Sequence, residues 1–121
     1  MRTQQTTERL TAYKVLTSDE MAALERDRVF KGSLVDLEDG YIHLSTADQL
    51  AATVDKHFDG QKGLHILAVD IAALGETLKW EPARGGALFP HLYAALSLEA
   101  VVAYGPLERY EDGRLKPPVT G

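Results

Sequence analysis

Two histidines of this sequence lie in segments whose neighbours could support proton transfer or ligand binding. His43 lies in the run Tyr41-Ile-His-Leu-Ser-Thr46, and His91 follows Pro90 near the end of residues 80–93. Imidazole changes its protonation state near neutral pH, so both side chains are candidate catalytic residues. The alternative for each is a structural histidine that only hydrogen-bonds the backbone.

Hydroxyl groups accompany His43. If residues 41–44 form a strand, alternation places Tyr41, His43 and Ser45 on one face. Thr46 follows, and Gln49 three positions later completes the pattern of a helix capping box. Because the free N–H groups of a helix start favour anions, we predict that Ser45 and Thr46 contribute to substrate binding.

The segment 80–93 combines several groups that bind ligands. It contains the only Trp, Trp80, and it has Arg84 beside Gly85 and Gly86 and ends in Tyr93. Glycines allow close backbone approach, guanidinium binds phosphate or carboxylate, and rings stack on planar groups. We predict that this segment is a pocket-lining loop and that these residues bind substrate. Arg-Gly-Gly is also a common exposed turn, and a lone Trp is more often part of a core.

No metal site is predicted. His57 and His65 fit structural roles, and no short His spacing provides a third ligand beside His43 and His91. The sequence has no cysteine, which excludes disulfides and Cys-zinc sites.

The elements that must position these residues follow from local patterns. Capping boxes at Thr17 and Thr46 predict helices over about 18–28 and from 46 to about 58. Alternation and apolar runs predict strands over about 12–16, 41–44, 64–71, 77–81 and from 101, with 64–71 central and 35–40 an acidic loop. Helices early and strands late favour an α+β fold, with a small mixed or split sheet of about five to six strands and two main helices.

Length and composition set the class of protein. The 121 residues predict a disordered tail over 1–10 and a single α+β domain over 11–121. The net charge of -5 argues against general nucleic-acid binding. No apolar run is long enough to span a membrane, and the polar N-terminus is not a secretory signal, so a cytoplasmic location is expected.

Three runs of residues resemble a known family. The runs Asp39-Gly-Tyr-Ile-His-Leu-Ser-Thr46, Trp80-Glu-Pro and Gly85-Gly-Ala-Leu-Phe-Pro-His-Leu-Tyr93 resemble the bacterial domain of unknown function 952. That family is distantly similar to the ADP-ribosyltransferase fold, which includes the RNA 2'-phosphotransferases and binds NAD between two small sheets. The resemblance implies that His43 orients a ribose, that Arg84 and His91 contact phosphate or ribose, and that Tyr93 or Trp80 offers a ring.

Two functional hypotheses follow. The first is a small cytoplasmic enzyme, or former enzyme, that binds a nucleotide-like or phosphorylated ligand in a cleft between strand 41–46 and loop 80–93. NAD is its candidate cofactor. The alternative is a non-catalytic ligand-binding or protein-interaction module that uses the same pocket. Neither the substrate nor the oligomeric state follows from the sequence.

Overall fold

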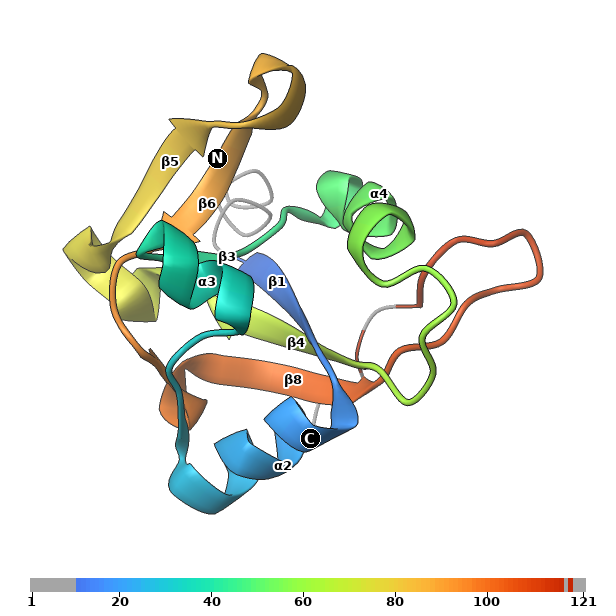
Figure 1. Ribbon diagram of the computed structural model, residues 1–121, viewed down its shortest axis with the longest axis horizontal. Coiled ribbons are helices and arrows are strands. Elements are labelled where there is room, and N and C mark those ends of the chain that lie inside the picture. The colour runs from blue at the N-terminus through green and yellow to red at the C-terminus, as the bar shows by residue number, and fades with distance from the viewer. Residues whose placement is uncertain (1–10, 117, 119–121) are drawn as a thin grey trace, which may run out of the picture.

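A computed structural model describes residues 11–116 and residue 118 of the chain, apart from the side chain of Arg84. Residues 1–10, which the sequence predicts to be a disordered tail, lie outside the described residues. The described part combines helices with small antiparallel sheets (Figure 1). The predicted α+β class is therefore confirmed.

The central sheet contains three antiparallel strands in the order β1-β4-β8, namely β1 (Thr11–Leu16), β4 (His65–Asp70) and β8 (Val101–Pro106) (Figure 1). The sequence predicts a central position for residues 64–71 because both faces of this strand are apolar, and β4 is the middle strand. Successive side chains on a strand point to opposite faces, so Leu67 packs in one hydrophobic cluster and Ile66 in another.

A second antiparallel sheet contains three strands, in the spatial order β3 (Ile42–His43), β6 (Leu88–Leu92) and β5 (Leu78–Pro82). A third contains two strands, β2 (Val29–Phe30) and β7 (Leu96–Ser97). Tyr13 and Ser45 exchange backbone hydrogen bonds of 2.7 and 2.9 Å. This bridge joins β1, an edge of the central sheet, to the residues that follow β3, an edge of the second sheet. The two edges therefore lie side by side.

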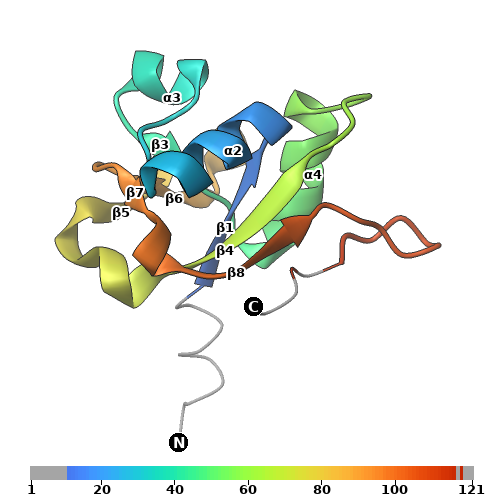
Figure 2. The same ribbon diagram turned by 90° about the horizontal axis from the view of Figure 1, so that it is seen from below.

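Two helices cover opposite faces of the central sheet (Figure 2), α2 (Ser18–Asp27) and α4 (Ala47–His57). Leu24 of α2 belongs to the same hydrophobic cluster as Leu67, whereas Leu50 of α4 belongs to the cluster of Ile66. Both helices begin with the predicted capping boxes, which are formed by Thr17 with Glu20 and by Thr46 with Gln49.

Three short 3-10 segments complete the described elements, η1 (Ile71–Thr77), η2 (Arg84–Gly86) and η3 (Leu98–Ala100). Within the described part of the chain, no helix has the length and apolar character needed to cross a membrane.

One predicted loop is a helix. The sequence predicts an acidic loop over residues 35–40, but α3 (Leu34–Asp39) occupies this part of the chain. Its capping box pairs Ser33 with Asp36, whose carboxylate accepts the Ser33 backbone N–H at 2.9 Å. Gly40 ends the helix in a left-handed conformation, at φ 90°. The described chain therefore has three α-helices and eight strands, more than the two helices and five to six strands predicted.

The segment 80–93 is not an irregular loop. It forms most of a β-hairpin in which β5 pairs with β6 and η2 makes the turn (Figure 1). The glycines lie in that turn, and Pro90 lies inside β6, where its carbonyl accepts the Leu44 N–H at 3.0 Å. Proline and glycine are loop signals in a sequence, which is why the hairpin was missed.

Candidate functional site

His43 and His91 lie on adjacent strands. They are register partners in the antiparallel pairing of β3 with β6, and their ring centroids are 5.7 Å apart in an edge-on arrangement. Side chains of directly paired residues point to the same face of a sheet. The two candidate catalytic residues therefore share one surface, although they come from distant parts of the sequence.

A buried carboxylate fixes the ring of His43. Asp36, whose side chain is 2% exposed, lies 2.6 Å from His43 Nδ1 and also accepts the His43 backbone N–H at 3.1 Å. Burial by itself would raise the pKa of Asp36. The His43 hydrogen bond, the Lys14 charge and backbone N–H groups outweigh burial and set this pKa well below its usual range. Asp36 is therefore ionised, and Nδ1 of His43 carries the proton that it donates.

Lys14 completes this buried network from β1. Its ammonium lies 3.0 Å from Asp36 Oδ2 and donates a 3.0 Å hydrogen bond to the carbonyl oxygen of His43. A buried ion pair requires such additional partners, because both charges have left water. Lys14, Asp36 and His43 thus connect β1, α3 and β3 at one point.

A second carboxylate lies at the other ring nitrogen of His43. Asp39 Oδ2 is 2.9 Å from Nε2, and the Asp39 side chain is 46% exposed. Ionised carboxylates only accept hydrogen bonds, so a ring nitrogen of His43 must carry a proton to bond to either of them. The geometry places one carboxylate acceptor at each ring nitrogen of His43.

His91 has its own carboxylate and an aromatic cover. Its buried ring contacts Glu81 Oε1 through Nδ1 at 2.7 Å, and Tyr41 stacks on the ring with centroids 4.1 Å apart. Glu81 also accepts the Tyr93 hydroxyl at 2.7 Å. The hydrogen bond from His91, followed by that from Tyr93, lowers the pKa of Glu81, and the Glu81 hydrogen bond raises the pKa of Tyr93 to about 12.

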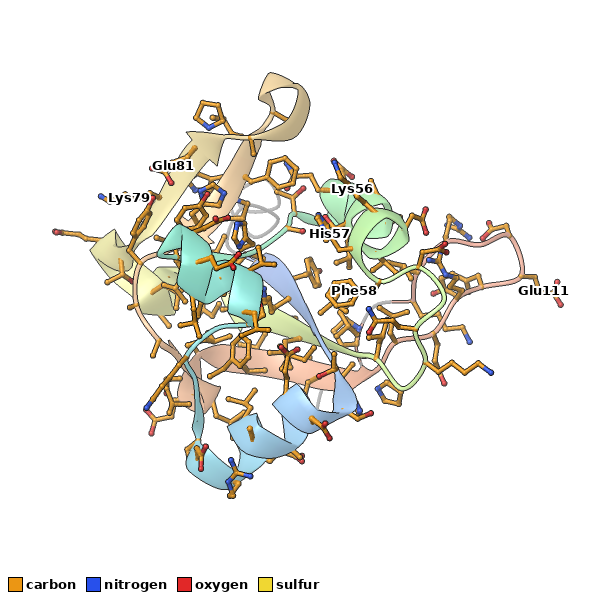
Figure 3. All side chains as sticks on the ribbon, in the orientation of Figure 1. Lys56, His57, Phe58, Lys79, Glu81 and Glu111 are labelled. Atoms are coloured by element: carbon orange, nitrogen blue, oxygen red, sulfur yellow. The ribbon has the colours of Figure 1, made fainter. Side chains whose placement is uncertain are left out.

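The histidines open onto a cavity of about 570 Å³. Its walls come from β1, α3, β3, β6 and the last turn of α4, where Lys56, His57 and Phe58 lie (Figure 3). Its polar lining includes Lys14, Glu20, Asp36, Asp39, His43, Ser45, Thr53, Lys56, His57, Gln61 and His91. This volume lies within the range of small-molecule sites.

The cavity differs from the cleft that the sequence predicted. Strand 41–46 and segment 80–93 do contribute His43, Ser45, Phe89 and His91, but they lie side by side and form one wall. The rest of the lining comes from α3, β1, the start of α2 and the end of α4, which the prediction did not include.

The other predicted binding residues are dispersed. The Ser45 hydroxyl lies in the cavity wall, 3.1 Å from the hydroxyl of Thr53. The hydroxyl of Thr46 is engaged in capping α4. Gly85 and Gly86 lie in the hairpin turn at φ 68° and 82°, and both are exposed. Neither glycine nor Thr46 is among the cavity-lining residues.

The aromatic and basic candidates of segment 80–93 separate as well. Trp80 pairs with Pro90, the residue before His91. Because side chains alternate along a strand, Trp80 lies on the face of the hairpin opposite to His91. It is 41% exposed, and it belongs neither to the core nor to the histidine surface. Tyr93 does reach that surface, with its ring 5.2 Å from Tyr41. The side chain of Arg84 lies outside the described part of the structure.

Sequence reasoning missed several residues of the site, among them Lys14, Asp36, Asp39 and Glu81. Signals for two of them were present. A lysine inside the apolar strand 12–16 requires a buried partner, and Ser33 with Asp36 has the spacing of a capping box. No local pattern marked Asp39. Among the described residues, no three His, Asp or Glu side chains are arranged to hold a metal ion.

Comparison with known proteins gives a family and a fold. The family model for a protein of unknown function, DUF952, matches residues 15–104. The crystal structure of protein CC0527 from Caulobacter crescentus is 45% identical, covers 88% of this chain and 93% of its own, and superposes with a TM-score of 0.80. The solution NMR structure of CC0527 gives 46% identity, coverage of 86% and 90%, and a TM-score of 0.74. No curated protein matches the chain.

Proposed function

Since the chain belongs to the DUF952 family, a membership that assigns no activity, we propose from its site that it is a small-molecule enzyme. It binds a nucleotide-like or phosphorylated ligand in the cavity beside His43 and His91, and these two residues transfer protons. The observation that carries the proposal is the pairing of two histidines, each with its own carboxylate, on one cavity wall.

The hydrogen bonds assign different roles to the two histidines. His43 donates toward Asp36 and Asp39, so it acts as a proton donor or as an anchor for negative charge. Glu81 is ionised and accepts from Nδ1 of His91, so Nε2 is the ring nitrogen that remains to accept a proton. His91 is therefore the general base. A neighbouring donor and acceptor are the minimum that acid–base catalysis requires.

The ligand class is supported by the cavity and by the family resemblance. A cavity of about 570 Å³ accepts a nucleotide-sized molecule, and Lys56, which lines it near the end of α4 (Figure 3), provides positive charge for phosphate. The resemblance to the ADP-ribosyltransferase fold makes NAD the first candidate. With NAD, the bond between ribose C1' and nicotinamide breaks, nicotinamide leaves with the electron pair, and a nucleophile activated by His91 bonds to C1'.

A second candidate function is a non-catalytic binding or interaction module. It is favoured by α3, which exposes 81% of Leu34, 54% of Val35 and 61% of Leu37. Contiguous exposed apolar side chains are typical of surfaces that contact a partner. In this alternative the same cavity binds a metabolite or peptide without turnover.

Thermal shift measurements with NAD, ADP-ribose and 2'-phosphorylated RNA test the ligand class. A ligand at 100 times its dissociation constant should add about 2.7 kcal/mol to the free energy of unfolding. If none of the three ligands shifts the unfolding temperature, the binding-module alternative is favoured.

Turnover of the ligand that binds tests the catalytic roles. We expect His43→Gln and His91→Gln each to lower kcat by about 10²- to 10⁴-fold, the usual contribution of general acid–base catalysis. His65→Gln is the matched control, because His65 lies on β4 and does not line the cavity. Turnover that survives both site substitutions would remove the catalytic assignment.

A further inference from the structure

The two carboxylates at His43 lie in different surroundings. Asp36 is 2% exposed. It is held by Lys14, by the backbone N–H groups of Ser33 and His43 and by the ring of His43. Asp39 is 46% exposed, and its carboxylate contacts Nε2 of His43 at 2.9 Å. Asp36 is therefore held in place by the fold. Asp39, in contrast, can leave Nε2 of His43 and be replaced there by solvent or by a ligand.

We propose that Nε2 of His43 is an oxyanion subsite and that Asp39 occupies it in place of a ligand's phosphate or carboxylate group. This inference rests on the proposed function and specifies which atom binds the anionic end of the ligand. Asp39 then acts as an internal competitor. The ligands of this site are then molecules with an anionic oxygen, because a neutral molecule has no charged group that could replace the Asp39 carboxylate at Nε2.

The charges around His43 favour this exchange. Asp36 accepts from Nδ1, so Nε2 is the ring nitrogen that faces an anion, and a proton on Nε2 is donated to whatever anion lies there. Exposed ion pairs are weak because water and salt screen them, so displacing Asp39 costs little. Lys56 lines the same cavity and adds positive charge for an incoming anion.

The position of Asp39 also permits the exchange. It is the last residue of α3, and Gly40 follows it in a left-handed conformation at φ 90°. Rotation of the Asp39 side chain can release Nε2 while Asp36, three positions earlier in the helix, keeps its contacts with Lys14 and His43. The subsite can therefore open without unfolding α3.

Titration with inorganic phosphate and, separately, with acetate tests the subsite. The readouts are the imidazole ¹H–¹⁵N NMR signals of His43 and the dissociation constant of each anion. We expect Asp39→Asn and Asp39→Ala to bind the anion about two- to fivefold more tightly than the wild type, since a screened like charge is removed. Asp27→Asn removes the same charge from an exposed position outside the cavity and should leave the affinity unchanged.

Each outcome is decisive. A response to phosphate alone identifies the subsite as one for phosphate, and a response to both anions identifies a general oxyanion subsite. If neither anion moves the His43 signals in any variant, or if the wild type and both Asp39 variants bind equally, the inference is wrong. Turnover of NAD or binding of ADP-ribose alongside such a result would leave the proposed function intact, so the two failures are distinguishable.

Discussion

Asp36 determines the geometry of His43 at the scale of single residues. It accepts the ring Nδ1–H at 2.6 Å, pairs with Lys14 and caps α3 with the same carboxylate. An imidazole without such a partner can exchange tautomers and rotate, and its second nitrogen then has no fixed role. Asp36 is thus a positioning residue, and His43 is the group that faces the cavity.

Replacing Asp36 should be costly. We expect Asp36→Asn to lower the free energy of unfolding by about 3–5 kcal/mol, because it leaves the buried Lys14 without its partner charge. Urea denaturation measures the change. Asp55→Asn is the control, since the Asp55 pair with Arg109 is 68% exposed on the Asp55 side and should contribute about 0–1 kcal/mol. Equal costs for the two substitutions would contradict the buried network.

The same substitution has a pH signature. The pKa of Asp36 is lower in the folded protein, so its contribution is fully present above the unfolded carboxyl pKa of about 3.9 and is lost as pH falls toward the folded pKa. The difference in unfolding free energy between wild type and Asp36→Asn should therefore shrink below about pH 4. A difference that stays constant down to the acid limit of the measurement would contradict the lowered pKa.

Tyr93 provides a second titration. The Glu81 hydrogen bond raises the pKa of Tyr93 to about 12, so its contribution to stability is present below about pH 10, the unfolded tyrosine pKa, and is lost as pH rises through the folded pKa. We expect Glu81→Gln to return the pKa toward 10, as measured by ¹³C NMR of the tyrosine ring. Tyr93→Phe identifies the signal. A pKa unaffected by Glu81→Gln would show that Glu81 is not the cause.

At the scale of elements, α3 depends on the glycines at its two ends. Gly32 and Gly40 have φ of 127° and 90°, which disfavour any residue with a Cβ atom. A Cβ on Gly32 would lie 2.9 Å from Cβ of Asp36, whereas a Cβ on Gly40 would meet nothing within 4 Å. A side chain at Gly40 would therefore cause backbone strain alone, whereas a side chain at Gly32 would also collide with Asp36.

This contrast predicts different outcomes for two alanine variants. Gly40→Ala should cost about 1–2 kcal/mol from left-handed backbone strain alone and leave the His43 ring signals unchanged. Gly32→Ala should cost more and shift those signals, because Asp36 must move. Denaturation and imidazole NMR measure the two effects. If both variants affect stability and His43 equally, Asp36 does not depend on close packing against Gly32.

At the scale of the whole molecule, β4 has a hydrophobic cluster on each face. Ile66 and Leu67 are both 0% exposed and lie in different clusters, one with α4 and the other with α2. We expect Ile66→Ala and Leu67→Ala each to cost about 2–5 kcal/mol. Val102→Ala on β8, where Val102 is 52% exposed, should change stability by about 0.5 kcal/mol or less. A low cost at either β4 position would show that its face is not packed.

The features that depend on neighbouring residues could be predicted from the amino-acid sequence. Two capping boxes located the starts of α2 and α4, and the apolar faces of residues 64–71 located the central strand. The capping rule also applies to Ser33 and Asp36, so α3 was within reach of the sequence. Each signal is local, because a cap or an alternation involves residues within a few positions of one another.

The assembly of the site depends on contacts between residues that are distant in the sequence. Lys14 and Asp36 are 22 positions apart, and the partnership of His43 with His91 depends on which strand pairs with β3 and in which register. A one-residue change of register would move a side chain to the opposite face, as Trp80 shows, which pairs with Pro90 and lies on the face opposite to His91. No periodicity in the sequence encodes that register, which is set by packing of the whole chain. The histidines could therefore be selected from the sequence, but their carboxylate partners could not.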